Sequence, residues 1–210
     1  MMVEIITIDG PASSGKSTLA KKISTYYKSP LLHSGLLYRK IAAEIISKKI
    51  QISKKELIKI AKSISIKKIE EGDLFSSEVD NISSKISAKK YIRNILKEIQ
   101  LEFPRKYAKG KKYAIIEGRD IGTEIFPDAK HKIFIWADAK IRAQRRFDQI
   151  AKKRQKSSLR RVYREIITRD LKDLNRKIAP LRPAANSVLL DTSYLDIEQA
   201  FNVINKILNT

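Results

Sequence analysis

Residues 6–22, ITIDGPASSGKSTLAKK, constrain the fold of this chain more than any other segment, because an apolar run meets a glycine-bearing turn and a helix-like stretch. Within them, GPASSGKS at 10–17 has the spacing G-x-x-x-x-G-K-[ST] of a phosphate-binding P-loop. The glycines let the backbone curl so that N–H groups point inward, and the start of the helix adds partial positive charge. A plain βα turn is the alternative, but the expected strand before the motif and the expected helix after it favour a phosphate cradle.

Short apolar runs alternate with helix-like patterns along the rest of the chain. The expected strands are residues 3–8, 29–34, 112–117, 131–137 and 187–192. The expected helices are residues 15–27, 35–49, 53–63, 88–107, 139–155, 158–176 and 196–208. Apolar strands separated by helices predict an α/β fold whose parallel sheet is covered on both faces and binds ligands beyond the carboxyl ends of the strands. Residues 64–87 are the least regular, and we expect a short hairpin or loop there.

The composition is compatible with one basic domain. The chain has 210 residues, enough for a single core with small additions. Its formal net charge of +21 would suit a nucleic-acid partner, but the lysines are spread among isoleucines and serines, so we expect solvated basic faces and no such partner. The chain lacks cysteine, a secretory leader pattern and any apolar stretch of about 18 residues, which predicts a cytoplasmic protein that contacts no membrane.

Arginine and aspartate recur in segments that the expected sheet would bring near the P-loop. They are YR at 38–39, GRD at 118–120 and TRDLKDLNRKIAPL at 168–181. In the last of these, Arg169, Asp173 and Arg176 fall on one helical face. Such a face taken alone is more often an exposed set of salt bridges. Three arginine-bearing segments around one P-loop instead favour phosphoryl transfer, since catalysis of that reaction is mainly positioning and charge stabilisation.

Four stretches together resemble the bacterial cytidylate kinase family: IDGPASSGKST, SGLLYR, EGRDIGTEIFPDAKHKIFIWADAKIRAQRR and RDLKDLNRKIAPLRPAANSVLLDTS. They occur in the family's order and cover nearly the whole chain, and the run GRD-I-G-T-x-x-F-P-D-A is much more specific than the P-loop. The resemblance implies a nucleoside monophosphate kinase fold, in which a P-loop NTPase-type parallel sheet carries an acceptor-binding insertion and a lid. It also implies that a monomer transfers the γ-phosphate of ATP to CMP or dCMP with Mg²⁺ as cofactor.

The resemblance implies an ATP site on the P-loop. Its expected residues are Gly10, Pro11, Ala12, Ser13, Ser14, Gly15, Lys16, Ser17 and Thr18. In a P-loop, Lys16 would reach the β- and γ-phosphates, and the Ser17 hydroxyl would coordinate Mg²⁺. The basic segment AKKRQKSS opens an expected lid region at 151–170, and Arg154 is its candidate ATP contact. A solvated basic helix end is the alternative interpretation of Arg154.

The resemblance also implies a CMP site. Its expected residues are Ser34, Arg39, Ser84, Arg93, Arg119, Asp120, Arg169, Asp173 and Arg176. Arginines 39, 119 and 176 would hold the acceptor phosphate and the transferring phosphoryl group, because a guanidinium binds two phosphate oxygens at once. The sugar would meet residues 169 and 173, and cytosine would meet residues 84, 93 and 120. The expected catalytic residues are Lys16, Arg119, Asp120 and Arg176.

Two features depart from the family's pattern. His33 stands where the family usually has an aspartate before Ser-Gly, which removes a carboxylate near the acceptor. The acceptor-binding insertion, placed within residues 64–95 of a single 1–210 domain, is short, as though a strand pair had been trimmed. We therefore expect it to form an arm that is mobile without nucleotide. We interpret His33 and His131 as structural and Trp136 as a core residue.

Two other functions fit parts of the sequence. A P-loop kinase of another small acceptor, such as AMP, dTMP or shikimate, would share the architecture and differ at the base-contacting residues. A basic, ATP-regulated nucleic-acid-binding protein would account for the net charge of +21.

Overall fold

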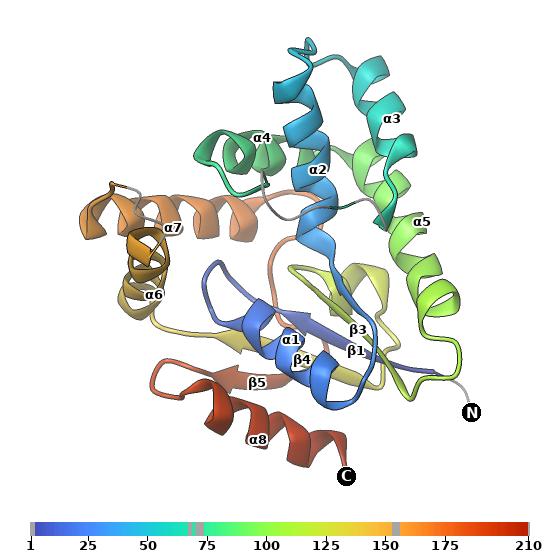
Figure 1. The fold of residues 1–210 in the computed structure, drawn as a ribbon, viewed down its shortest axis with the longest axis vertical. Helices are drawn as coiled ribbons and strands as arrows, with labels where there is room; N and C mark the ends of the chain where they lie inside the picture. The colour runs from blue at the N-terminus through green and yellow to red at the C-terminus, as the bar shows by residue number, and fades with distance from the viewer. Residues whose placement is uncertain (1–2, 67–68, 70–73, 153–155, 210) are drawn as a thin grey trace.

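A five-stranded parallel sheet forms the centre of the molecule (Figure 1). The structure is a computed structural model, and it describes residues 3–66, 69, 74–152 and 156–209. The strand order is β2-β3-β1-β4-β5. The strands are β1 (Glu4–Asp9), β2 (Leu31–His33), β3 (Tyr113–Gly118), β4 (His131–Trp136) and β5 (Val188–Asp191). All five predicted strands are present, and the predicted parallel α/β architecture is confirmed.

The register of the sheet places the P-loop beside the GRD turn. Strand β1 lies between β3 and β4, with Asp9 opposite Gly118 on one side and Phe134 on the other. Because parallel strands end at the same edge, residues 10–17 and 118–120 leave the sheet side by side. A functional site at this edge therefore takes side chains from both turns.

Two layers cover the sheet. Helices α1 (Lys16–Tyr26) and α8 (Ile197–Leu208) pack on one face, where Leu19, Ile23 and Phe201 join the main apolar cluster. The other face is covered by a π-helical turn, η3 (Ile121–Ile125), and by the end of α5 (Lys90–Tyr107). Burial on both faces explains why the strands are continuous apolar runs.

A lobe of four helices rises above the carboxyl edge of the sheet (Figure 1). It consists of α2 (Ser34–Ser47), α3 (Lys54–Ser63), α4 (Ser77–Ser87) and α5, which share an apolar cluster of their own. The expectation of a hairpin or loop throughout 64–87 is wrong, because α4 is a helix. The Ser76 hydroxyl caps it by accepting a hydrogen bond from the Val79 N–H at 3.2 Å, and Val79 and Ile86 are buried in the cluster.

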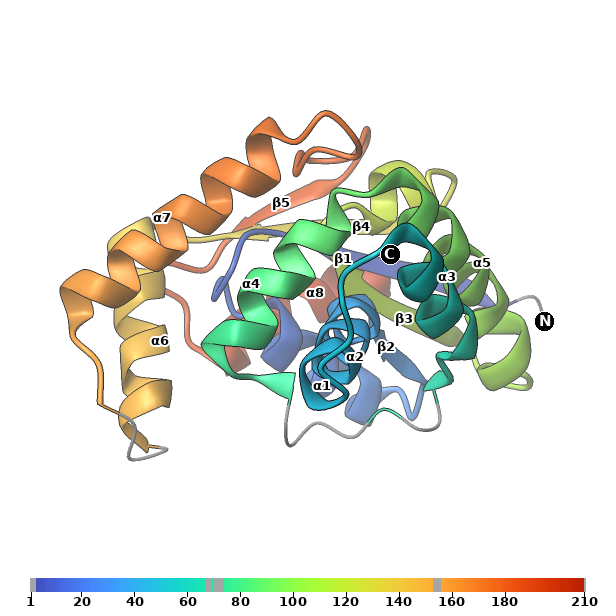
Figure 2. The same cartoon turned by 90° about the horizontal axis from the view of Figure 1, so that it is seen from above.

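Helices α6 (Ala139–Lys152) and α7 (Leu159–Asn175) form a hairpin on the other side of α4 (Figure 2). They pack through Ala143, Val162 and Ile166, and the residues between the helices at 153–155 lie outside the described part. All seven predicted helices are present. No helix in the described residues is long and apolar enough to span a bilayer.

The prediction that Trp136 belongs to the core is wrong, since its side chain is 43% exposed. Alternation along β4 explains this. Ile133 and Ile135 point to the face covered by α1 and α8, so Trp136 points to the opposite face, at the end of a strand that pairs with the edge strand β5.

Candidate active site

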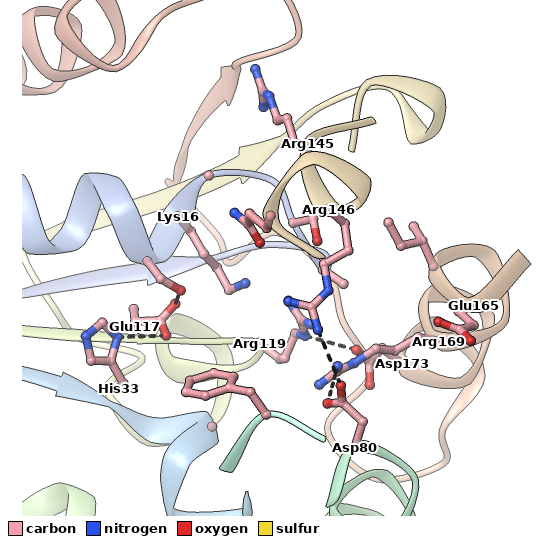
Figure 3. A pocket seen from close by; sticks show the side chains of 18 of the residues that line it. Lys16, His33, Asp80, Glu117, Arg119, Arg145, Arg146, Glu165, Arg169 and Asp173 are labelled. Carbon is pink, nitrogen blue, oxygen red and sulfur yellow. Dashed lines mark hydrogen bonds and ion pairs between the residues drawn. The ribbon is translucent and has the colours of Figure 1, made fainter. Parts of the chain in front are cut away.

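A cavity of about 1400 Å³ opens at the carboxyl edge of the sheet. Its walls come from the P-loop, α2, α4, the end of β3, and the α6–α7 hairpin (Figure 3). Parallel α/β sheets bind ligands at this edge, where loops and helix N-termini converge. The cavity runs from the P-loop at one end to α4 at the other, which leaves room for two ligands placed end to end.

The P-loop backbone adopts a curl that requires glycine. Gly10 has a φ of 153°, and a Cβ there would lie 1.9 Å from the carbonyl oxygen of Ile135. Gly15 has a φ of 90° and is the N-cap of α1, so the helix N-terminus faces the cavity. Both features are those of an anion cradle.

Most of the predicted ATP-site residues line the cavity. They are Ala12, Ser13, Gly15, Lys16, Ser17 and Thr18. Gly10, Pro11 and Ser14 lie in the same loop but are not part of the cavity wall, and the Pro11 carbonyl accepts a hydrogen bond from Lys16 Nζ at 3.2 Å. Arg154, the predicted lid contact, lies outside the described residues.

Lys16 lies beside a buried carboxylate, Glu117, which the sequence analysis missed. Burial lowers the pKa of Lys16 to about 7. Burial alone would raise the pKa of Glu117, but the charge of Lys16 and the hydrogen bond with His33 hold that pKa below its ordinary value. An acidic residue at the end of an otherwise apolar strand, KYAIIE, was the available signal.

Glu117 joins His33 to Ser17. One carboxylate oxygen lies 3.0 Å from His33 Nδ1, and the other accepts a hydrogen bond from the Ser17 hydroxyl at 3.1 Å (Figure 3). His33 therefore lines the cavity, in contact with a carboxylate of the neighbouring strand. His131 lies away from the cavity and pairs with Glu4 at 3.1 Å.

Arginines from the end of β3 and the end of α7 meet next to the P-loop. Arg119 donates a hydrogen bond to the Gly10 carbonyl and pairs with Asp173 through Nε at 2.9 Å. Asp173 also lies 3.9 Å from Arg176, the third residue after it along the chain. The sheet edge and α7 thus bring together two of the arginines expected to contact phosphate.

Asp120 lies between two guanidinium groups. It pairs with Arg93 from α5 and accepts a hydrogen bond from Arg176 Nη2 at 3.4 Å. Arg93 also donates to the Ser87 carbonyl at 3.1 Å, which fixes its orientation. Asp120 and Arg93 are both buried, so this pair is held in place at the inner end of the cavity.

The structure brings all the predicted CMP-site residues to one cavity. Its lining includes Ser34, Arg39, Ser84, Arg93, Arg119, Asp120, Arg169, Asp173 and Arg176. Charged residues that were not predicted as site residues also line the cavity, among them Asp80, Arg145 and Arg146. Arg145 and Arg146 end a stretch that resembles the family, but no spacing in the sequence shows that Arg146 meets Asp80 or that Arg145 meets Thr192.

Arg145 belongs to the P-loop end of the cavity. It donates to the Thr192 hydroxyl at 3.3 Å, and that hydroxyl donates to the Ser14 carbonyl at 2.9 Å. Asp170 ties α7 to the same loop, because it pairs with the buried Arg142 and accepts a hydrogen bond from the Ala12 N–H at 3.4 Å. The α6–α7 hairpin is therefore connected to the P-loop backbone.

Comparisons with known proteins agree with this arrangement. The family model described as cytidylate kinase matches residues 6–210. The cytidylate kinase of Brucella suis biovar 1 (strain 1330) is 35% identical over 206 residues, covering 98% of this chain and 92% of that protein. The cytidylate kinase of Bartonella tribocorum is 39% identical over 200 residues, covering 95% and 91%.

Solved structures share the fold. A shikimate kinase from Bacteroides thetaiotaomicron aligns with a TM-score of 0.50 at 16% identity, covering all of both chains. TT1252 from Thermus thermophilus aligns with a TM-score of 0.55 at 14% identity, covering 99% of each chain. At such low identity the likeness concerns the fold alone.

Proposed function

This chain belongs to the cytidylate kinase family, and we propose that it transfers the γ-phosphate of ATP to CMP or dCMP, giving ADP and CDP or dCDP. The observation that carries the proposal is a single cavity with a P-loop lysine at one end and a set of arginines at the other. A phosphate donor and a phosphate acceptor would lie end to end in it. Phosphoryl transfer needs this positioning more than it needs covalent chemistry.

The P-loop would bind the ATP phosphates. Its N–H groups and the N-terminus of α1 supply a preorganised positive potential, and Lys16 adds a charge at the β- and γ-phosphates. Arg119 would contact the transferring phosphoryl group, since it lies between the Gly10 carbonyl and Asp173, where the P-loop end of the cavity meets the arginine end.

The residues around Ser17 fit a magnesium ion. Ser17 and Glu117 offer hard oxygen atoms within 3.1 Å of each other at the end of the P-loop. Mg²⁺ at nucleotide sites takes most of its ligands from phosphates and water, so one or two protein oxygens suffice. Ser17 would hold the ion, and Glu117 would orient the Ser17 hydroxyl. When bound, Mg²⁺ neutralises charge on the β- and γ-phosphates.

The acceptor phosphate would lie among Arg39, Arg119 and Arg176. Its oxygen is already anionic, so attack on the γ-phosphorus requires no general base. Arg169 and Asp173 would contact the sugar. The predicted lid region, which includes the first turns of α7, would close over ATP and exclude water, which limits hydrolysis.

Cytosine would be recognised by Ser84, Arg93 and Asp120. Asp120 would accept a hydrogen bond from the exocyclic amine of cytosine or orient Arg93, which would donate to the ring acceptors. Facing uracil, the carboxylate would oppose a carbonyl oxygen, a buried mismatch that costs about 1–3 kcal/mol. The buried pair of Asp120 with Arg93 supports this role, because its geometry is set before the nucleotide arrives.

A coupled ADP-release assay with each common nucleoside monophosphate tests the proposal. We expect turnover with CMP and dCMP to exceed that with UMP by about five- to 150-fold, given the mismatch energy of about 1–3 kcal/mol. Equal or greater turnover with AMP or dTMP would contradict the cytosine assignment. ATP consumption without any monophosphate dependence would contradict the kinase itself.

A further inference from the structure

Asp80 contacts three arginines that reach it from three different helices. It pairs with Arg39 of α2, with Arg169 of α7 at 2.9 Å, and with Arg146 of α6 at 4.0 Å. Figure 3 shows the Arg146 and Arg169 side chains turned toward the Asp80 carboxylate. Asp80 itself lies on α4, the helix that the sequence analysis did not predict.

One carboxylate does not balance three guanidinium groups. Burial, together with the charges of Arg169 and Arg146, lowers the pKa of Arg39 to about 10. The charge of Asp80 acts in the opposite direction and raises this pKa. The cluster therefore keeps a net positive charge and attracts a further or a stronger anion. Two of its members, Arg39 and Arg169, are those proposed above to contact the phosphate and sugar of the acceptor.

We propose that Asp80 is an internal competitor of the acceptor phosphate, which occupies Arg39 and Arg169 until the phosphate of CMP displaces it. The proposal rests on the proposed function. A phosphate dianion carries more charge than a carboxylate and offers three oxygens, so it binds a planar guanidinium pair more strongly.

The exchange needs no unfolding of α4. The side chain of Asp80 is 25% exposed, so rotation can carry the carboxylate into water. The preceding residue, Val79, stays in the buried cluster shared with α2 and α5. Asp80 thus pairs with these arginines in place of solvent anions, and only a phosphate that is well placed against them displaces the carboxylate.

Calorimetric titration of Asp80→Asn with CMP and with cytidine tests the proposal. Removing the competitor should tighten CMP by about five- to tenfold, the size expected from several partly exposed ion pairs. Cytidine, which has no phosphate to replace the carboxylate at Arg39 but can still meet the freed Arg169 with its sugar, should tighten less than CMP, and ATP should be unaffected. A loss or no change of CMP affinity would overturn the proposal, because it would mean that Asp80 orients the arginines for the phosphate. Equal tightening of CMP and cytidine would also overturn it.

Glu78→Gln is the matched control. Glu78 lies in the same first turn of α4, is exposed, and forms no ion pair among the described residues, so its removal takes away the same charge without freeing arginines. Asp80→Ser provides a second neutral variant, and both Asp80 variants should unfold at temperatures close to that of the wild type.

Inorganic phosphate separates this proposal from the proposed function. Its affinity should also rise in Asp80→Asn, whichever nucleoside the enzyme accepts. If the wild type shows no turnover with CMP, the proposed function fails, while the phosphate titration still decides the role of Asp80. If CMP is turned over and neither CMP nor phosphate binds more tightly to the variant, only the role of Asp80 fails.

Discussion

The two ends of the cavity are built in different ways. The P-loop end comes mainly from one continuous stretch, residues 10–18, completed by Glu117 from the adjacent strand and by Arg145 from α6. The arginine end takes side chains from α2, α4, α5, α6, α7 and the turn after β3. A phosphate cradle is thus a local property of sequence, whereas a site that distinguishes one acceptor from another requires the tertiary fold.

The charges differ as well. At the P-loop end, one lysine is buried enough for its pKa to fall to about 7, beside one carboxylate. At the arginine end, the guanidinium groups expected to bind CMP already have carboxylate partners, as in Arg119 with Asp173 and Arg93 with Asp120. Phosphate binding at the first site adds an anion to a cation, while binding at the second exchanges one anion for another.

The largest effect is expected where the two ends meet. Lys16→Ala and Arg119→Ala should each lower kcat by about two orders of magnitude or more, since each removes a preorganised charge from the transferring phosphoryl group. Steady-state kinetics with saturating ATP and CMP measures this. Lys22→Ala is the control on the same helix, because Lys22 pairs with Glu198 at the surface. Near-normal turnover in a folded Lys16 or Arg119 variant would contradict its assigned role.

Arg93→Ala should weaken the binding of CMP much more than the binding of ATP. Losing a hydrogen bond to a charged group costs about 1.5–3 kcal/mol, so the KM for CMP should rise about ten- to hundredfold. The KM for ATP should remain within about twofold, because Arg93 lies only at the arginine end. Lys90→Ala, at an exposed position one turn earlier in α5, should leave both constants unchanged. Similar losses for both substrates would show that Arg93 supports the whole fold.

The same contrast explains what the sequence could predict. The P-loop, the five strands and their parallel direction follow from local motifs and from apolar runs, and each was predicted. The helix α4 was missed because SEVDNISSKIS is rich in serine and in β-branched residues, which favour helices weakly. Tertiary packing of Val79 and Ile86 overrides that preference.

The missed side chains follow from the missed helix and from strand pairing. Asp80 meets Arg146 only once α4 stands beside the α6–α7 hairpin, and no spacing in the sequence encodes that contact. Glu117 meets His33 because β2 and β3 are neighbours in register. The family resemblance brought Arg39, Arg93 and Arg176 to attention together with Asp120 and Asp173, but Asp80, the partner of Arg39, became visible only in the structure.

A buried carboxylate under the P-loop should make stability depend on pH. Asp9 accepts hydrogen bonds from the N–H groups of Ile121 at 2.9 Å and Gly122 at 2.7 Å, yet burial raises its pKa to about 7. Between about pH 4 and pH 7 the unfolded chain has lost this proton while the folded protein keeps it. The folded state then binds more protons, so its stability falls as the pH rises, by up to about 1.4 kcal/mol per pH unit.

Urea unfolding of the wild type and of Asp9→Asn across this range checks the prediction. The asparagine does not titrate, so the free energy of unfolding of the wild type relative to the variant should decrease from pH 4 to pH 7. A relative stability that instead increases with pH would mean that the two N–H groups outweigh burial and keep Asp9 charged. The carboxylate beneath the P-loop would then be charged, like the carboxylates that pair with arginines at the other end of the cavity.

Hydrogen exchange should show the smallest effect and the most direct comparison of the two ends. The amides of α4 lie in a helix that is packed on α2 through Val79 and Ile86, so they should be partly protected without nucleotide. CMP should slow their exchange several-fold further, because it replaces the contacts of Asp80 and bridges α4 to the core. ATP should instead protect residues 10–18 and leave α4 nearly unchanged. Protection of α4 that is already complete and insensitive to CMP would show a rigid arm. The short insertion would then be a fixed wall of the acceptor site, and the difference between the two ends would lie in their charges alone.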